Sequence, residues 1–326
     1  MKQNKYEIDM CNGTIMDKLI SFSLPLMLSG ILQLMFNAVD IIVVGRFSGS
    51  QALAAVGSTT ALINVFTNLF IGISLGANVL AARYYAAGKT KEMSETVHTA
   101  IALALVSGVA MAVIGVVFAR GALEIMGTPD DVIAKSTLYM RIYFCGMPFF
   151  MMYNYGAAIL RAVGDTRRPV YFLFAAGAVN VVLNLFFVIQ LGMGVDGVAW
   201  ATVISECVSA GLIIRSLMKE NGAMKLHLTK LRIVSGKLTQ IVRVGLPAGM
   251  QGAIFSISNV LIQSSVNSFG SIAMAGNTAS SNIEGFVYTA MNAVYQTSLS
   301  FTSQNLGGEK FSRIDKIKNI CLGVVT

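Results

Sequence analysis

The hydrophobic and polar positions of this chain alternate on the scale of whole helices. Apolar runs of membrane-spanning length, nearly free of ionisable side chains, recur along the sequence between short charged segments. Such a run covers about 30 Å as an α-helix at roughly 1.5 Å per residue, which matches the hydrocarbon core of a bilayer. Long runs without strict alternation predict helices, because lipid cannot satisfy an open backbone. We place spans at 19–45, 53–81, 97–119, 132–160, 169–191, 195–214, 241–267 and 280–304, with a ninth run beginning near Ile317.

Composition supports a chain that lies in lipid. Hydrophobic residues make up 55% of the 326 residues and charged residues 12%, against roughly 25% charged residues in a typical soluble domain. No cleavage site of small residues follows the first apolar run, so this run is expected to be a retained span and not a signal peptide. Pro148 lies inside the span at 132–160 and predicts a kink there. The sequence therefore predicts an all-α integral membrane protein.

The Lys and Arg residues gather on one side of the predicted spans. Twenty of the 24 lie in the amino-terminal segment, in every second loop and after the last full span. The other side carries only Arg46, Arg120, Lys135 and Arg141. Because cytoplasmic loops carry the excess of Lys and Arg, this asymmetry predicts a multi-pass protein of the cell membrane with a cytoplasmic amino terminus. The basic stretch at 219–243 is then expected to lie along anionic lipid headgroups, and no nucleic-acid partner is expected.

The Cys and His residues form no pattern typical of a metal site. The four Cys residues have no CxxC spacing and the chain has two His residues, so no metal and no other cofactor is expected. An enzyme in the membrane would need a nucleophile with a base, or a metal cluster, and His98 and His227 both lie near cytoplasmic span ends. We therefore expect no enzymatic activity. Cys145 and Cys207 fall within apolar runs and are expected to be buried.

Two parts of the sequence resemble each other at an offset of about 220 residues. Leu24-Pro25 matches Leu246-Pro247 and Gly30 matches Gly252, both at an offset of 222. The repeat contains six spans, an even number, so both copies have the same orientation. Transporters built from parallel repeats handle their substrate between the two bundles.

The repeat predicts how the chain is divided. Residues 1–218 are expected to form an amino-terminal lobe of six helices, and 219–240 a basic cytoplasmic linker. Residues 241–326 are expected to form a partial carboxy-terminal lobe with spans 7, 8 and the start of span 9. Two copies would need about 440 residues, so we expect the sequence to be truncated in its second lobe.

Asp40 is the only charged residue of the first span. A carboxylate in a membrane helix costs a few kcal/mol on insertion scales and usually marks an ion or proton path. Asp40 lies in the outward half of the span, so a charge simply wetted at the membrane boundary is the alternative. Its repeat partner is the uncharged Ile262, so the acid belongs to the first lobe alone.

Spans 5 and 6 carry four further polar candidates. Asn180 and Asn184 are four residues apart and share a helix face, which is expected to look into a bundle because unpaired amides are costly in lipid. Ordinary helix–helix hydrogen bonding is the alternative. Glu206 lies at the middle of an otherwise uncharged run and shares a face with Thr202. A carboxyl at this depth is expected to be neutral at rest and able to exchange a proton, the alternative being a protonated structural residue.

Several stretches resemble one transporter family. The first span contains Val39-Asp40-Ile41-Ile42-Val43-Val44-Gly45-Arg46, which resembles the first-helix signature of the multidrug and toxic compound extrusion (MATE) family. The stretch 194–205 looks like the family's entry to span 6, and 245–249, 276–278 and 304–305 are similar to spans 7 and 8. The order of these motifs is specific, and the resemblance covers nearly all of the chain. It implies two six-helix lobes arranged in a V around a central cavity.

The resemblance also implies an activity and a cation site. The family exports cationic or amphipathic compounds, driven by inward flow of protons or sodium ions. Its amino-lobe cation site combines the Asp of span 1 with polar residues of spans 5 and 6, which implies roles for Asp40, Asn180 and Thr202. The family commonly has an Asp where this chain has Asn184. The second carboxylate is thus replaced by an amide, and the coupling ion stays open between H⁺ and Na⁺.

The sequence therefore favours a multidrug efflux antiporter that acts on cationic or amphipathic small molecules, contacts membrane lipids and is expected to be monomeric. The candidate binding residues are Asp40, Asn180, Asn184, Thr202 and Glu206. One alternative is a lipid-linked saccharide flippase of the same wider superfamily, which usually has more basic residues in its cavity than these spans contain. The other alternative is an inactive fragment.

Overall fold

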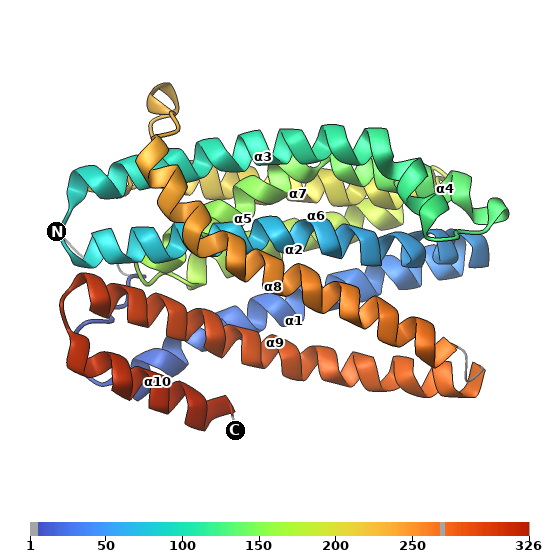
Figure 1. Ribbon diagram of the computed structural model, residues 1–326. Coiled ribbons are helices and arrows are strands. Elements are labelled where there is room, and N and C mark those ends of the chain that lie inside the picture. The colour runs from blue at the N-terminus through green and yellow to red at the C-terminus, as the bar shows by residue number, and fades with distance from the viewer. Residues whose placement is uncertain (1–5, 268–270, 326) are drawn as a thin grey trace.

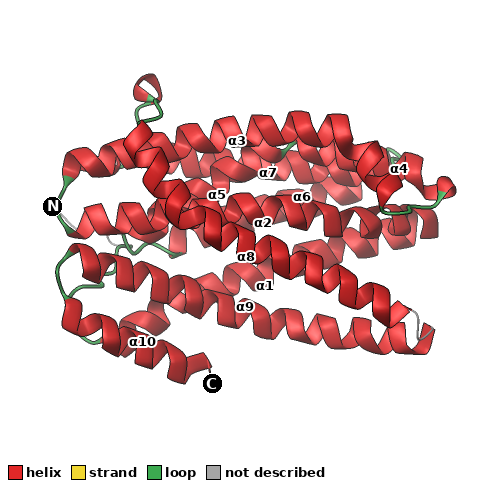
Figure 2. Cartoon of the chain, viewed as in Figure 1, coloured by secondary structure: helices red, strands yellow, loops and turns green. Residues whose placement is uncertain are grey.

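The computed structural model describes residues 6–267 and 271–325, and the ribbons of Figure 1 and Figure 2 show these as helices joined by short loops. The helices lie roughly side by side along one direction. Their bounds are α1 Ile15–Phe47, α2 Ser50–Ala86, α3 Thr90–Ile125, α4 Asp130–Cys145, α5 Met147–Ala162, α6 Arg167–Leu185, α7 Val195–Lys219, α8 Ser235–Asn267, α9 Ser271–Gly307 and α10 Phe311–Val325. A short π-helix, η1 (Phe186–Gln190), continues α6, and two 3₁₀ turns, η2 (Gly222–Met224) and η3 (Leu228–Lys230), lie between α7 and α8.

The predicted spans coincide with these helices, most of which extend beyond the apolar runs. Among the described residues, six helices are long and apolar enough to cross a membrane: α1, α2, α3, α6 with η1, α7 and α8. The predicted fourth span falls on α4 and α5 together, and the eighth on α9. The apolar run that begins near Ile317 lies in α10. The prediction of an all-α membrane protein is confirmed.

The fourth predicted span is broken in its middle. α4 ends at Cys145 and α5 begins at Met147, with Gly146 between them and Pro148 in the first turn of α5. Proline lacks a backbone N–H, so it is tolerated in a first turn but interrupts a continuous helix. The predicted kink is thus a break between two helices of 16 residues each.

The connections alternate between the two ends of the bundle. The α2–α3, α5–α6, α7–α8 and α9–α10 connections lie at the same end as the described amino-terminal residues (Figure 1). The α1–α2 and α3–α4 connections lie at the opposite end. The first set contains the loops that hold most of the Lys and Arg residues, so we call this end the basic end.

α2 and α8 pack against each other through glycines. A methyl group built on Gly72 would overlap the backbone of Gly249, and one on Gly76 would overlap the carbonyl oxygen of Ile241. Side chains larger than hydrogen would separate the two helices, which cross closely in Figure 1. Small residues allow such close backbone approach between membrane helices, where packing drives association.

Two clusters of buried side chains hold the helices together. The larger cluster joins α2, α3, α4, α5 and α7, and the smaller one joins the segment before α1, the start of α1, α9 and α10. The expected burial of Cys145 and Cys207 is wrong, because both side chains are exposed on the outside of the bundle. In a membrane protein an apolar position can face lipid as readily as a core, so apolar surroundings in sequence do not predict burial.

Candidate functional site

Asp40 is brought to α6 by a close helix contact. Phe36, one turn before Asp40 on α1, lies against Gly177 of α6, where an added methyl group would overlap the aromatic ring. Glycine at this position therefore lets α1 and α6 approach each other. Asn184 lies two turns further along α6 than Gly177 and reaches Asp40.

A chain of hydrogen bonds runs from Asp40 through α6 to α7. The side-chain amide of Asn184 donates to Oδ1 of Asp40 and also to Oδ1 of Asn180, at 3.1 Å. The amide of Asn180 donates to Oγ1 of Thr202 at 3.4 Å, and the Thr202 hydroxyl donates to the carbonyl oxygen of Val198 at 3.0 Å. The structure thus brings four of the five predicted site residues into one connected group.

One atom of this group lacks a partner. The side chains of Asn180 and Asn184 are buried, at 5% and 0% exposure, and Oδ1 of Asn184 has no hydrogen-bond partner among the described residues. A buried polar oxygen left unpaired is unfavourable, and each such atom calls for an explanation such as a bound ion. The neighbouring carboxylate and amide oxygens are ligands that hard cations prefer.

The helix that carries Asn184 changes its geometry directly after this residue. The α-helical part of α6 ends at Leu185, and residues Phe186–Gln190 continue as a π-helix. Single π-helical turns are rare and occur frequently at functional sites. Nothing in the sequence predicts this turn, because most of its residues are as apolar as those of the preceding helix.

Glu206, the fifth predicted residue, does not join the hydrogen-bonded chain. Its Oε2 lies against Gly146, only 2.6 Å from where a Cβ atom would be, at the break between α4 and α5. No hydrogen bond or ion pair of its carboxyl group is found within the described part of the chain. A side chain at position 146 would displace this carboxyl group. The glycine at the break between α4 and α5 therefore leaves the space that Glu206 occupies.

Tyr139 and Tyr143 of α4 are site residues that the sequence analysis missed. Their rings stack with centroids 6.1 Å apart. Both hydroxyl groups lie close enough to Asp40 and to Glu206 to interact with them electrostatically. The two tyrosines are four residues apart and so share a helix face, which was the available signal. They are near both Asp40 and Glu206, two carboxyl groups that are separate candidates in the sequence.

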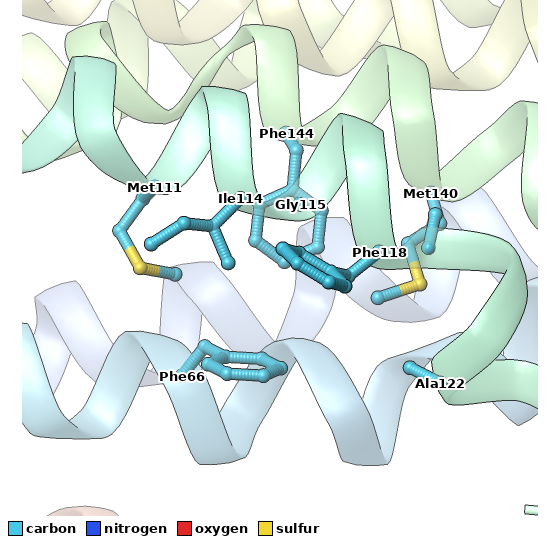
Figure 3. Close-up of a pocket in the computed structure, with 9 residues that line it drawn as sticks. Phe66, Met111, Ile114, Gly115, Phe118, Ala122, Met140 and Phe144 are labelled. Atoms are coloured by element: carbon cyan, nitrogen blue, oxygen red, sulfur yellow. The ribbon is translucent and has the colours of Figure 1, made fainter. Parts of the chain in front are cut away.

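A small apolar pocket lies elsewhere in the bundle, between α2, α3 and α4. Figure 3 shows Phe66 of α2 facing Met111, Ile114 and Phe118 of α3, with Phe144 of α4 beside Gly115. Its volume is only about 20 Å³, and none of its lining residues is charged. It offers no carboxylate that would bind a cation. Among the described residues, no cluster of three or more His, Cys, Asp or Glu side chains could hold a metal ion.

Comparison with known proteins identifies a family. The family model MatE matches residues 25–186 and 247–326, which together make up most of the chain. The probable multidrug resistance protein YoeA of Bacillus subtilis is 31% identical over 305 residues. That alignment covers 91% of this chain and 65% of YoeA, so the chain spans about two thirds of the length of this relative.

Two further similarities bear on fold and substrate class. A protein of Shewanella oneidensis named FAD transporter is 24% identical over 298 residues, which cover 89% of this chain and 65% of that protein. A solved structure described as an outward-facing conformation of a multidrug resistance MATE family transporter superposes with a TM-score of 0.91 at 23% identity. The superposition covers 99% of this chain and 72% of the other, and shows that the two share a fold.

Proposed function

Because this chain belongs to the MATE family, we propose that it is a secondary active antiporter of the cell membrane that exports cationic or amphipathic compounds in exchange for protons or sodium ions. The observation that carries the proposal is the buried hydrogen-bonded chain from Asp40 to Thr202 with its unpaired Asn184 oxygen. A carboxylate held within a membrane bundle among uncharged oxygens is suited to bind and release one cation or proton.

Each member of the chain has a role in this proposal. Asp40 carries the charge that the coupling ion neutralises. Asn184 responds to this neutralisation through its hydrogen bond to Asp40. This bond is charge-assisted, so it weakens when the carboxylate loses its charge. Asn180 and Thr202 orient the Asn184 amide and connect α6 to α7. Ion binding would thereby change how firmly α1 is held to α6, and through α6 to α7.

Glu206 is proposed as a second group that takes up protons. Its carboxyl group lies in the bundle against Gly146 and has no ionic partner in the described part of the chain. A carboxyl group in the membrane interior usually faces the bundle and marks a proton path. Tyr139 and Tyr143 supply hydroxyl groups near both it and Asp40.

We also infer that the basic end of the bundle faces the cytoplasm. The inference rests on the excess of Lys and Arg at this end, which follows the charge bias of cytoplasmic loops. Asp40 lies seven residues from the end of α1 that is opposite the basic end, so it would be reached from the outer half of the membrane. Protons or sodium ions entering from outside would meet it there.

The proposal is tested by efflux of a fluorescent lipophilic cation such as ethidium from cells that express the protein. Asp40→Asn is expected to lower the initial efflux rate by roughly tenfold or more, since each 1.4 kcal/mol of lost stabilisation is a factor of ten. The amount of protein in the membrane should not change, because an amide fits the same space. Asp131→Asn is the matched control: Asp131 is exposed in the first turn of α4, and its loss should leave efflux unchanged.

Transport by the purified protein in reconstituted vesicles distinguishes the alternatives. The vesicles are offered the lipophilic cation, a lipid-linked saccharide or FAD. FAD is included because one relative is named FAD transporter. Transport of either compound without transport of the cation would contradict drug export. If native and Asp40→Asn proteins export the cation equally, the assigned role of Asp40 is wrong. Absence of transport in every arm would favour an inactive fragment.

A further inference from the structure

A groove on the outside of the bundle lies at the basic end and is separate from the Asp40 group. It is formed by α3, α5, α7 and the connection between α7 and α8, and its volume is about 410 Å³. Its walls are almost entirely apolar, with Ile101 from α3, Phe149 from α5 and Ile214 from α7. The predicted function does not use this groove.

The connection between α7 and α8 forms one wall of the groove and is fixed in place. Leu228 and Leu231 line the groove from this connection. The backbone N–H of His227 donates to Nε2 of His98 on α3 at 3.1 Å, and the N–H of Val234 donates to Oγ1 of Thr99 at 3.2 Å. The His98 and His227 rings also stack, with centroids 6.3 Å apart. Hydrogen bonds and ring stacking therefore hold this wall of the groove in a defined position on α3.

One charged side chain lines the groove. Arg215 lies near the end of α7 at the basic end, is exposed, and has no carboxylate partner among the residues that the structure describes. Gly211 and Cys207 line the groove from the same face of α7, four and eight residues deeper into the bundle than Arg215. The apolar wall thus extends about 12 Å along α7 from Arg215, at 1.5 Å per residue.

The surroundings of Arg215 are strongly basic. Lys219, Lys225 and Lys230 are all exposed on the end of α7 and the connection beside it. Arg232 on the same connection has only a loose ion pair with Glu95, at 3.8 Å. An unpaired cation at the opening of a long apolar groove, in a basic surrounding, complements a molecule with an anionic head and a hydrocarbon tail.

We propose that this groove is a binding site for an anionic phospholipid of the leaflet at the basic end. One acyl chain lies between α3, α5 and α7 and reaches Cys207, and the phosphate pairs with Arg215. Basic pockets between membrane helices recognise anionic headgroups. Each Lys or Arg near the surface contributes about 1 kcal/mol of attraction to an anionic membrane. The bound lipid would contact the connection between α7 and α8 through Leu228 and Leu231, and so stabilise its position on α3. The proposal does not depend on the transported compound.

Native mass spectrometry of the purified chain tests the proposal. Delipidated protein in detergent is titrated with dioleoyl phosphatidylglycerol or with dioleoyl phosphatidylcholine, which have the same acyl chains. We expect one phosphatidylglycerol to bind in preference to phosphatidylcholine. Arg215→Gln is expected to lower this preference about fivefold, which corresponds to about 1 kcal/mol. Arg243→Gln, on α8 and outside the groove, is the matched control and should leave the preference unchanged.

A second variant tests the groove itself. An added Cβ at Gly211 meets nothing within 4 Å, so Gly211→Phe can be accommodated and would fill the groove. This variant is expected to lose the bound lipid whatever its headgroup, while it keeps the thermal stability of the native chain. Equal affinity of the native chain for both lipids would overturn the assigned headgroup. Unchanged lipid binding by Gly211→Phe, or full competition by glycerol phosphate without acyl chains, would overturn the groove as the site.

Discussion

At the residue scale, the amide side chain of Asn184 defines the chemistry of the candidate site. Asn184 occupies a place where a second acid would lie beside Asp40, and its amide donates to that carboxylate. The group therefore contains one carboxylate, with Asn180 and Thr202 as uncharged neighbours. A single carboxylate can be neutralised by one proton or one monovalent cation, whereas two would hold a cation more firmly.

Asn184→Asp is predicted to strengthen ion binding at this site. A second negative charge about 4 Å from the cation contributes up to roughly 4 kcal/mol at an effective dielectric constant of 20. We expect efflux by this variant to reach half its maximal rate at an ion concentration at least about tenfold lower. The measurement is the efflux rate as a function of sodium concentration at fixed pH, and of pH without sodium.

The exposed Asn12 provides the control for this change. Asn12→Asp adds the same charge outside the spans and should leave both ion dependences as in the native chain. An Asn184→Asp variant with unchanged dependence on both ions would show that position 184 does not contribute to the coupling site.

At the element scale, glycines decide which helices can meet. Gly72 and Gly76 let α2 approach α8 closely. Gly177 lets Phe36 pack on α6 and so brings Asp40 to Asn184. A glycine within a helix carries no signal about which neighbour approaches it, because that depends on residues distant in the sequence.

Gly177→Ala is predicted to separate α1 from α6. The added methyl group would overlap the Phe36 ring, and overpacking of this kind typically costs about 1–3 kcal/mol. We expect a lower unfolding midpoint in detergent and slower cation efflux. Phe36→Leu in the same chain should restore both in part, because it removes the aromatic ring that the methyl group meets.

Gly121→Ala is the matched control for this prediction. An added Cβ at Gly121, also within a helix, meets nothing within 4 Å. This variant should be neutral or slightly stabilised, by up to about 1 kcal/mol, because alanine favours a helix more than glycine does. If Gly177→Ala behaved like Gly121→Ala, the close contact would have no part in holding the site.

At the scale of the whole molecule, buried polar bonds tie α9 to α2 and α5 near the basic end. Asn78 of α2 donates to the carbonyl oxygen of Ala158 on α5 at 2.9 Å and accepts from the Ser300 hydroxyl of α9 at 3.1 Å. Gln304 of α9 donates to the carbonyl oxygen of Ala162 at 2.7 Å. A transporter that alternates access must separate its bundles at one end and then at the other. These bonds would hold the basic end closed.

Asn78→Ala is predicted to favour opening of the basic end. It leaves the Ser300 hydroxyl and the Ala158 carbonyl group without this partner, and an unsatisfied buried polar group costs about 1–3 kcal/mol. That energy corresponds to a five- to hundredfold change in the population of the open form, on the order of one decade per 1.4 kcal/mol. The measurement is the distance between spin labels placed at the basic ends of α5 and α9.

Ser258→Ala serves as the control, since Ser258 is exposed and its hydroxyl donates only within its own helix, to Ile254. It should leave the distribution of distances as in the native chain. The same distribution in Asn78→Ala would contradict a closing role for this polar cluster.

The sequence by itself determined the properties that depend on local composition. The length and polarity of the apolar runs predicted the helices, and the alternation of Lys and Arg predicted which connections share an end of the bundle. The spacing of Asn180 and Asn184 predicted that they share a face. The order along the chain of the motifs that resemble the MATE family predicted the family. These properties are local, because lipid forces each span to satisfy its own backbone.

Only the tertiary structure decided which distant residues meet. It joined Asp40 to α6 through the Phe36–Gly177 contact, brought Tyr139 and Tyr143 near both Asp40 and Glu206, and set Glu206 against the break at Gly146. It also placed Cys145 and Cys207 on the outside of the bundle, and formed the groove beside Arg215. Each of these results depends on how helices pack. In lipid the inward and outward faces of a helix can be equally apolar, so hydrophobicity alone does not distinguish them.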